Sequence, residues 1–122
     1  MTLLVTNEGE TALLDLMLSS DTVLRLYYND YTPLETSVYA DFAELNTDGY
    51  APITLTGGAW VVGSGTATYS AQTFTMTDAV DAFGYYVTTG TTCLWAERFS
   101  GAPFPIPDGG GTISVTPTIS LD

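Results

Sequence analysis

The segment QTFTMT, residues 72–77, decides the fold class of this chain. Phe74 and Met76 occupy alternate positions within it, and polar side chains fill the positions between them. Successive side chains of a β-strand point to opposite faces, so this order predicts a strand with one apolar and one polar face. Thr is the commonest residue of the chain, and its β-branched side chain suits the solvent face of a strand.

The same period of two returns in other segments on both sides of this strand. These segments are TVLRLYY (22–28), APITLT (51–56), FGYYV (83–87) and TISVTPTISL (112–121). Turn signals rich in Gly, Asn, Asp and Pro separate them at intervals of about a dozen residues. We therefore predict a mainly β fold: one antiparallel β-sandwich or jelly-roll-like domain over residues 1–122. Pro117 cannot donate to a strand ladder, so it predicts a sheet edge or a bulge.

The segment NEGETALLDLML, residues 7–18, has a different period and predicts one short N-terminal helix. Asn7 and Glu10 have the spacing of a capping box. The predicted apolar face of this helix, which we expect to lie on the sheet, consists of Leu13, Leu14, Met17 and Leu18. Thr11, Asp15 and Ser19 are expected on the opposite side, and residues 19–21 end the helix.

The charge of the chain excludes several classes of partner. There are 14 acidic residues, no lysine and no histidine, and the net charge is −12. A nucleic-acid-binding protein needs a basic surface, so we expect no nucleic-acid partner. An anionic membrane surface is disfavoured for the same reason. The first ten residues lack a basic region before an apolar run, and no apolar run approaches about 20 residues, so neither a signal peptide nor a membrane span is expected.

Catalytic and metal-binding patterns are equally sparse. Without histidine there is no Ser/His/Asp or Cys/His arrangement and no histidine-based zinc site. The nearest carboxylate pairs, Asp41 with Glu44 and Asp78 with Asp81, fall in or beside turns and are interpreted as solvated loop acids. We therefore expect a protein that is not an enzyme and that holds no cofactor and no metal.

The segment LWAERFSGAPFPIPDGGG, residues 94–111, contains chemically distinctive side chains but is interpreted as a structural corner. Its first part has strand composition, and its Pro- and Gly-rich part predicts a long turn before the last strand. Glu97 is expected to pair with Arg25 or Arg98. The single cysteine, Cys93, is expected to be buried and unreactive, because no histidine is present to activate it.

The aromatic residues predict mainly packing within the domain and, for the remainder, a protein interface. Tyr85 and Tyr86 are consecutive, so they are expected to point to opposite faces of their strand. Tyr and Trp are enriched at protein interfaces, and arginines in an acidic chain favour pairing or interface roles over catalysis. The expected interface residues are Arg25, Tyr27, Tyr31, Arg98 and Phe104.

In sequence the chain resembles small structural proteins of tailed-bacteriophage virions. The similarity covers nearly the whole chain in order. It lies in NEGETALLDLML (7–18), LRLYYNDYTP (24–33), GYAPITL (49–55), QTFTMT (72–77), FGYYVT (83–88), LWAERF (94–99) and TISVTPTISL (112–121).

The resemblance implies a virion structural role and leaves two locations open. The first is a capsid decoration (cement) protein that binds between major capsid subunits as a homo-oligomer, with a trimer as the usual geometry. The alternative is a tail- or fibre-associated structural or receptor-binding module that recognises carbohydrate. An apolar patch with an extended terminus favours the first, and exposed coplanar aromatic rings favour the second.

Overall fold

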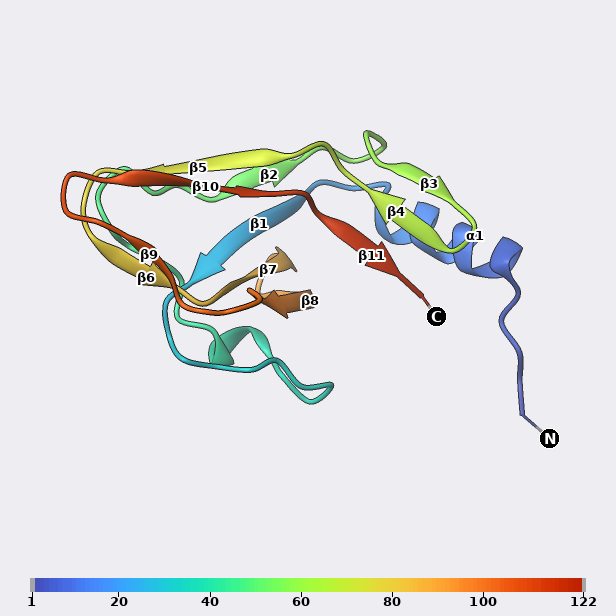
Figure 1. Cartoon of the computed structure of the whole chain (residues 1–122). Coiled ribbons are helices and arrows are strands. Elements are labelled where there is room, and N and C mark those ends of the chain that lie inside the picture. The colour runs from blue at the N-terminus through green and yellow to red at the C-terminus, as the bar shows by residue number, and fades with distance from the viewer. Residues whose placement is uncertain (1, 122) are drawn as a thin grey trace.

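The computed structural model describes residues 2–121 and shows a mainly antiparallel β fold with one α-helix near the N-terminus, consistent with the predicted sandwich-like class (Figure 1). The helix is α1 (Asn7–Met17), and a 3₁₀ turn, η1, covers Tyr39–Asp41. The strands are β1 (Thr22–Tyr27), β2 (Ile53–Leu55), β3 (Val61–Gly63), β4 (Thr66–Thr68), β5 (Gln72–Met76), β6 (Val80–Ala82), β7 (Gly84–Thr89), β8 (Thr92–Arg98), β9 (Phe104–Ile106), β10 (Gly111–Val115) and β11 (Thr118–Ser120).

The strands form one four-stranded sheet and three smaller ones. The order in the largest sheet is β2-β1-β7-β8, so β8 lies at its edge. The smaller sheets are β11-β4-β3, β10-β5 and β6-β9. In Figure 1, β5 and β10 run above β1, while β3, β4 and β11 extend toward α1 at the other end. The main core therefore lies between the four-stranded sheet and the layer that contains β5 and β10.

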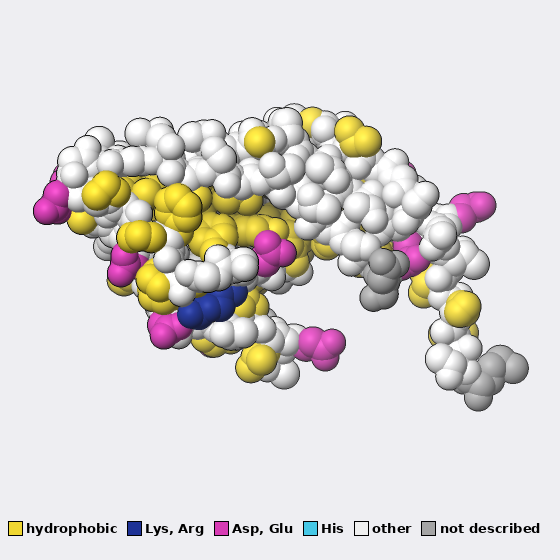
Figure 2. Space-filling model, viewed as in Figure 1, with side chains coloured by type: hydrophobic (Ala, Val, Ile, Leu, Met, Phe, Trp, Pro, Cys, Tyr) yellow, Lys and Arg dark blue, Asp and Glu magenta, His cyan; other side chains and the backbone are white. Residues whose placement is uncertain are grey.

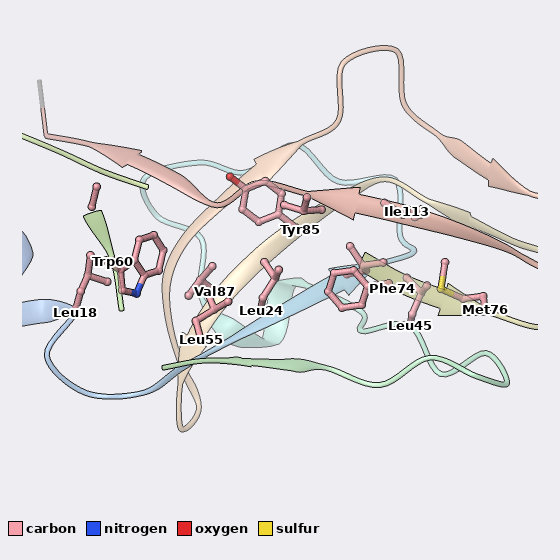
Figure 3. Packing of buried hydrophobic residues seen from close by; sticks show 14 of the residues in the cluster. Leu18, Leu24, Leu45, Leu55, Trp60, Phe74, Met76, Tyr85, Val87 and Ile113 are labelled. Carbon is pink, nitrogen blue, oxygen red and sulfur yellow. The ribbon is translucent and has the colours of Figure 1, made fainter. Parts of the chain in front are cut away.

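The strand predicted from QTFTMT is present and faces inward as expected. Phe74 and Met76 are buried, and Phe74 pairs in register with Ile113 of β10. Figure 3 shows Phe74 and Ile113 in the same cluster as Leu24 of β1. On the outer face, the hydroxyl groups of Thr73 and Ser114 share a hydrogen bond of 2.9 Å. Cross-strand hydroxyl contacts therefore stabilise the polar face of this strand pair.

The last predicted strand divides at Pro117. The chain leaves β5 at the end of β10 and joins β4 as β11, and Pro117 lies between the two strands. Its carbonyl oxygen accepts a hydrogen bond of 2.9 Å from the backbone N–H of Tyr69. Ile113, Val115 and Pro117 are all buried, so the inward phase continues through the change of partner strand.

The helix is present, but its cap and its buried side differ from the prediction. Thr6, not Asn7, is the N-cap, and its hydroxyl oxygen accepts a hydrogen bond of 3.1 Å from the Gly9 N–H. Leu14 is buried, whereas Leu13 is exposed. Thr11, expected on the outer side, accepts a hydrogen bond of 3.1 Å from the Gly65 N–H in the turn between β3 and β4. The side of the helix that is buried is therefore rotated about the helix axis relative to the predicted apolar face, because the helix packs on β3 and β4 rather than across a flat sheet.

The predicted long turn after β8 contains a short strand. Phe104–Ile106 forms β9 and pairs with β6, in the register Val80↔Ile106 and Ala82↔Phe104. Ile106 is buried, so its side chain anchors the segment to the core. The sequence prediction missed β9 because three residues with a central proline carry almost no strand signal.

No helix in the described part of the chain is long and apolar enough to cross a lipid bilayer.

Candidate functional site

A second apolar cluster covers the outer face of the four-stranded sheet. Tyr27, Phe42 and Tyr86 are its buried members, and the rings of Phe42 and Tyr86 stack with centroids 4.7 Å apart. Tyr27 packs edge-on against Phe42 at 5.1 Å. Tyr85 points to the main core instead, which confirms that Tyr85 and Tyr86 occupy opposite faces. The segment that links β1 to β2 contributes Phe42, so it closes this second face.

Arg25 fastens that linking segment to the sheet. Its Nε donates a hydrogen bond of 3.0 Å to the Thr88 hydroxyl, and its Nη1 lies 2.8 Å from Glu44 Oε1. The second oxygen of Glu44 accepts a 2.7 Å hydrogen bond from the Tyr50 hydroxyl. The Tyr50 oxygen in turn accepts a bond of 3.1 Å from the Leu26 N–H. This network joins β1 and β7 to two points of the segment between β1 and β2.

Arg98 makes a second attachment to the same segment. Its Nη1 lies 2.7 Å from Asp30 Oδ1, and its guanidinium lies 5.3 Å from the centre of the Phe83 ring. The expected pairing of Glu97 with an arginine is wrong, because both arginines use acids that follow β1. The two arginines thus hold the segment between β1 and β2, residues 28–52, which we call the covering segment. Both arginines pair with acids as expected, but the acids are Glu44 and Asp30 rather than Glu97.

The structure spreads the five expected interface residues over different environments. Tyr27 is fully buried and its hydroxyl donates to the Tyr31 carbonyl oxygen at 3.0 Å, so the expectation that Tyr27 contacts a partner is corrected. Arg25, Tyr31 and Arg98 are partly buried around the same cluster. Phe104 is exposed and lies apart from them on β9. The covering segment buries Tyr27, and the alternation of side chains within β1 does not predict that another segment covers this face.

Burial changes the acidity of the aromatic side chains. Desolvation raises the pKa of Tyr27 and of Tyr85 from 10.0 to about 12. Burial, followed by the hydrogen bond to Glu44, raises the pKa of Tyr50 further, and burial also raises the pKa of Tyr86. These phenols are therefore neutral hydrogen-bonding and packing groups at physiological pH, with no sign of activation as acids or bases.

Cys93 is partly buried rather than fully buried, which corrects the expectation from sequence. Burial raises the pKa of its thiol, so little thiolate is present at neutral pH. The described residues contain no group of three or more metal-ligating side chains.

An open groove runs beside β8, where the four-stranded sheet ends. Its volume is about 340 Å³, and it lies between residues 33–37 of the covering segment and residues 93–96 of β8, with Phe42 also in its lining. Residues 93–96 are all partly exposed. β8 is seven residues long and has a bulge at Leu94, the residue skipped between the pairs Val87↔Trp95 and Thr88↔Cys93.

The N-terminal arm, defined as residues 2–6, exposes apolar side chains that the sequence interpretation did not use. Leu3, Leu4 and Val5 are 92%, 81% and 56% exposed. In Figure 2 the arm projects from the body at the helix end of the molecule, with apolar side chains along it. Leu13 and Leu16 of α1 are also exposed. An uncharged apolar run before the helix cap was the available signal in the sequence.

Comparison of the chain with protein-family models, with curated proteins and with solved structures found no match. The features of the chain that bear on its function are the exposed arm, the edge strand and the composition.

Proposed function

We propose that this protein is a non-catalytic building block of a bacteriophage virion, a capsid decoration (cement) protein that binds between major capsid subunits as a homo-oligomer, most simply a trimer. The observation that carries the proposal is the N-terminal arm, which extends from a packed body and exposes Leu3, Leu4 and Val5. Exposed apolar surface of this kind is typical of a site that another protein covers. The phage attribution itself rests on the sequence resemblance.

The chemistry of the body supports a static binding role. The chain has no histidine, and its two arginines are already paired with acids of the same chain. The perturbed phenols are stabilised in their neutral form by burial. A structural component needs none of these groups to react, and it benefits from a body that holds one shape.

The distribution of charge also supports assembly through the arm. The net charge is −12, so two copies repel each other over most approaches. The arm itself carries no charged side chain. An acidic outer surface keeps free copies apart, and an uncharged apolar arm gives them one favoured point of attachment. An oligomer on a symmetric capsid lattice then gains strength from several weak contacts made at once.

The alternative of a carbohydrate-binding module at a tail tip has less support. Such a module uses exposed aromatic faces. Among the aromatic side chains of the described residues, only those of Tyr28 and Phe104 are exposed. They lie on separate elements, after β1 and in β9. Most other aromatic rings pack inside the two clusters.

The test is to image purified virions by electron cryomicroscopy and to assign density for this chain. We expect density on the capsid surface at local three-fold or quasi-three-fold positions. Density confined to the tail or fibres would overturn the capsid proposal and favour the alternative. A matched biochemical test compares capsid binding by a Leu3→Ser/Leu4→Ser/Val5→Ser variant with binding by Leu13→Ser, which changes an exposed leucine of the helix.

A further inference from the structure

The outer edge of β8 is an open end of the largest sheet. Among residues 2–121, β7 is the only strand paired with β8. Alternate residues of an edge strand direct their backbone N–H and C=O groups away from the sheet, and another chain can pair with them. Natural edges are usually short or strongly charged, whereas residues 92–96 of β8 carry no charge. A bulge such as the one at Leu94 can turn an edge away from a partner, but no second strand among residues 2–121 pairs with the outer side of β8.

The N-terminal arm has the form of a strand without a partner. Thr6 at its end has φ −73° and ψ 161°, an extended conformation, and the arm is drawn out in Figure 1. Leu, Val and Thr fill residues 2–6, and no Pro or Gly interrupts them. Five residues in β conformation span about 17 Å, which is enough to pair with residues 92–96.

We propose that the arm of one copy adds as a strand to the outer edge of β8 in a second copy of this chain. Its apolar side chains then cover the groove beside residues 93–96, where Leu34, Phe42 and Ala96 provide apolar lining. Backbone hydrogen bonds supply the general attachment, and alternate side chains select the register. This inference deepens the homo-oligomer part of the proposed function and rests on it, but it does not require a capsid.

A second copy fits the arm better than the arm's own molecule does. The arm leaves the body beside α1 and points away from it (Figure 1). Residues 2–6 and residues 92–96 both lack charge in a chain of net charge −12, so pairing of these two segments brings no like charges together. Glu35, which also lines the groove, meets an uncharged arm. The interface is head-to-tail, because the arm and the edge are different surfaces. Such interfaces form a closed ring when the rotation between copies closes, and a three-fold rotation gives the trimer expected for a capsid site.

The lone cysteine makes the proposal directly testable. Leu3→Cys, Leu4→Cys and Val5→Cys each add a second thiol to a chain whose own thiol, Cys93, lies on the proposed edge. The full-length variants are oxidised mildly at low protein concentration. Disulfides are then located by mass spectrometry after separation without reductant. The matched control is Leu16→Cys, which is 74% exposed against 81% for Leu4 but lies on the helix.

We expect covalent links between the arm of one chain and Cys93 of another, and their yield should alternate along the arm. Neighbouring strand residues point to opposite faces, so positions 3 and 5 should behave alike and differ from position 4. Leu16→Cys should give a much lower yield. Adding Cys93→Ser to the best-linked variant should abolish the link, which separates an arm-to-edge bond from an arm-to-arm bond.

Three outcomes would overturn the proposal. One is a link between the arm and Cys93 within a single chain. Another is an equal yield at positions 3, 4 and 5, which indicates random collision rather than strand pairing. The third is no link at any arm position together with rapid hydrogen exchange at the outward-facing β8 amides of the wild-type protein.

The result can be separated from the fate of the capsid proposal. If the arm links to β8 but the protein does not bind capsids, the strand addition stands and the capsid role fails. If the protein binds capsids as a monomer and β8 exchanges freely until capsids are added, a capsid segment occupies the edge, and the second-copy proposal is overturned while the capsid role stands.

Discussion

The body and the arm of this protein use the same kinds of side chain in opposite ways. In the body, Leu14, Leu24 and Phe74 are buried and join the helix to both layers of the core. In the arm, Leu3, Leu4 and Val5 point into solvent. Burial of apolar side chains is the main favourable term in folding, so the arm adds little to the stability of a single copy. The body is therefore stabilised by its own apolar contacts, and the exposed side chains of the arm agree with the proposal that another molecule covers them.

The largest effect on the body is expected from Phe74→Ala. Phe74 lies at the centre of the core between the two layers (Figure 3). Removing its ring leaves a cavity, and we expect the free energy of unfolding to fall by about 3–5 kcal/mol. Denaturant unfolding monitored by tryptophan fluorescence measures this loss. A change below about 1 kcal/mol would contradict the assignment of Phe74 to a well-packed core.

Unfolding at alkaline pH tests the burial of one tyrosine on each face of the four-stranded sheet. Tyr85 faces the main core, and Tyr27 faces the second cluster. Burial raises the pKa of each phenol from 10.0 to about 12. The folded state therefore holds more protons than the unfolded chain between these values, and the free energy of unfolding decreases as pH rises through this window. The stabilisation that these protonated phenols contribute to the folded state is fully present below pH 10. Tyr85→Phe should weaken the pH dependence, and an unchanged slope would contradict the burial of this hydroxyl.

Arg25→Ala should destabilise the body by a smaller amount than Phe74→Ala. The change removes bonds to Glu44 and Thr88 and loosens the cover over Tyr86. Hydrogen bonds to charged groups contribute about 1.5–3 kcal/mol, and partial exposure of this pair places the expected loss at the lower end. Thermal unfolding measures it. Equal melting of Arg25→Ala and wild type would show that the network does not hold the covering segment.

Arg98→Ala is the matched comparison for Arg25→Ala and should have a weaker effect. Its partner Asp30 is 76% exposed, so solvent and salt screen the pair. Exposed ion pairs contribute about 0.2–1 kcal/mol. The loss should shrink further at high salt, whereas the loss for Arg25→Ala should change less. A larger effect for Arg98 than for Arg25 would reverse the roles assigned to the two arginines.

The sequence predicted the elements whose side-chain period is set within one strand. The alternation around Phe74 gave both the strand and its buried face, and the same holds for β10. It did not predict features that depend on what a distant segment covers. Tyr27 is buried because Phe42 and its segment fold over β1, and Leu13 is exposed because the helix turns Leu14 toward β3 and β4. β9 depends on pairing with β6 rather than on its own three residues.

The candidate surfaces were predictable only in part. The acidic composition and the lack of histidine favour a binding role over catalysis, and the sequence resemblance predicts a role in virions. The edge of β8 became visible only from the strand order, because position within a sheet is a long-range property. The arm was visible as an uncharged apolar run, but a sequence alone does not tell whether such a run is buried.

The smallest expected effect on the body comes from changing the arm, and it tests the central claim most directly. The measurement is sedimentation equilibrium of the wild type and of Leu3→Ser/Leu4→Ser/Val5→Ser, combined with denaturant unfolding at the lowest workable protein concentration. At that concentration mass action no longer favours an oligomer, so only the single copy is compared. We predict that the wild type is a homo-oligomer, that the variant is a monomer, and that both unfold at the same midpoint. A monomeric wild type, or a variant that keeps its oligomeric mass, would contradict the account.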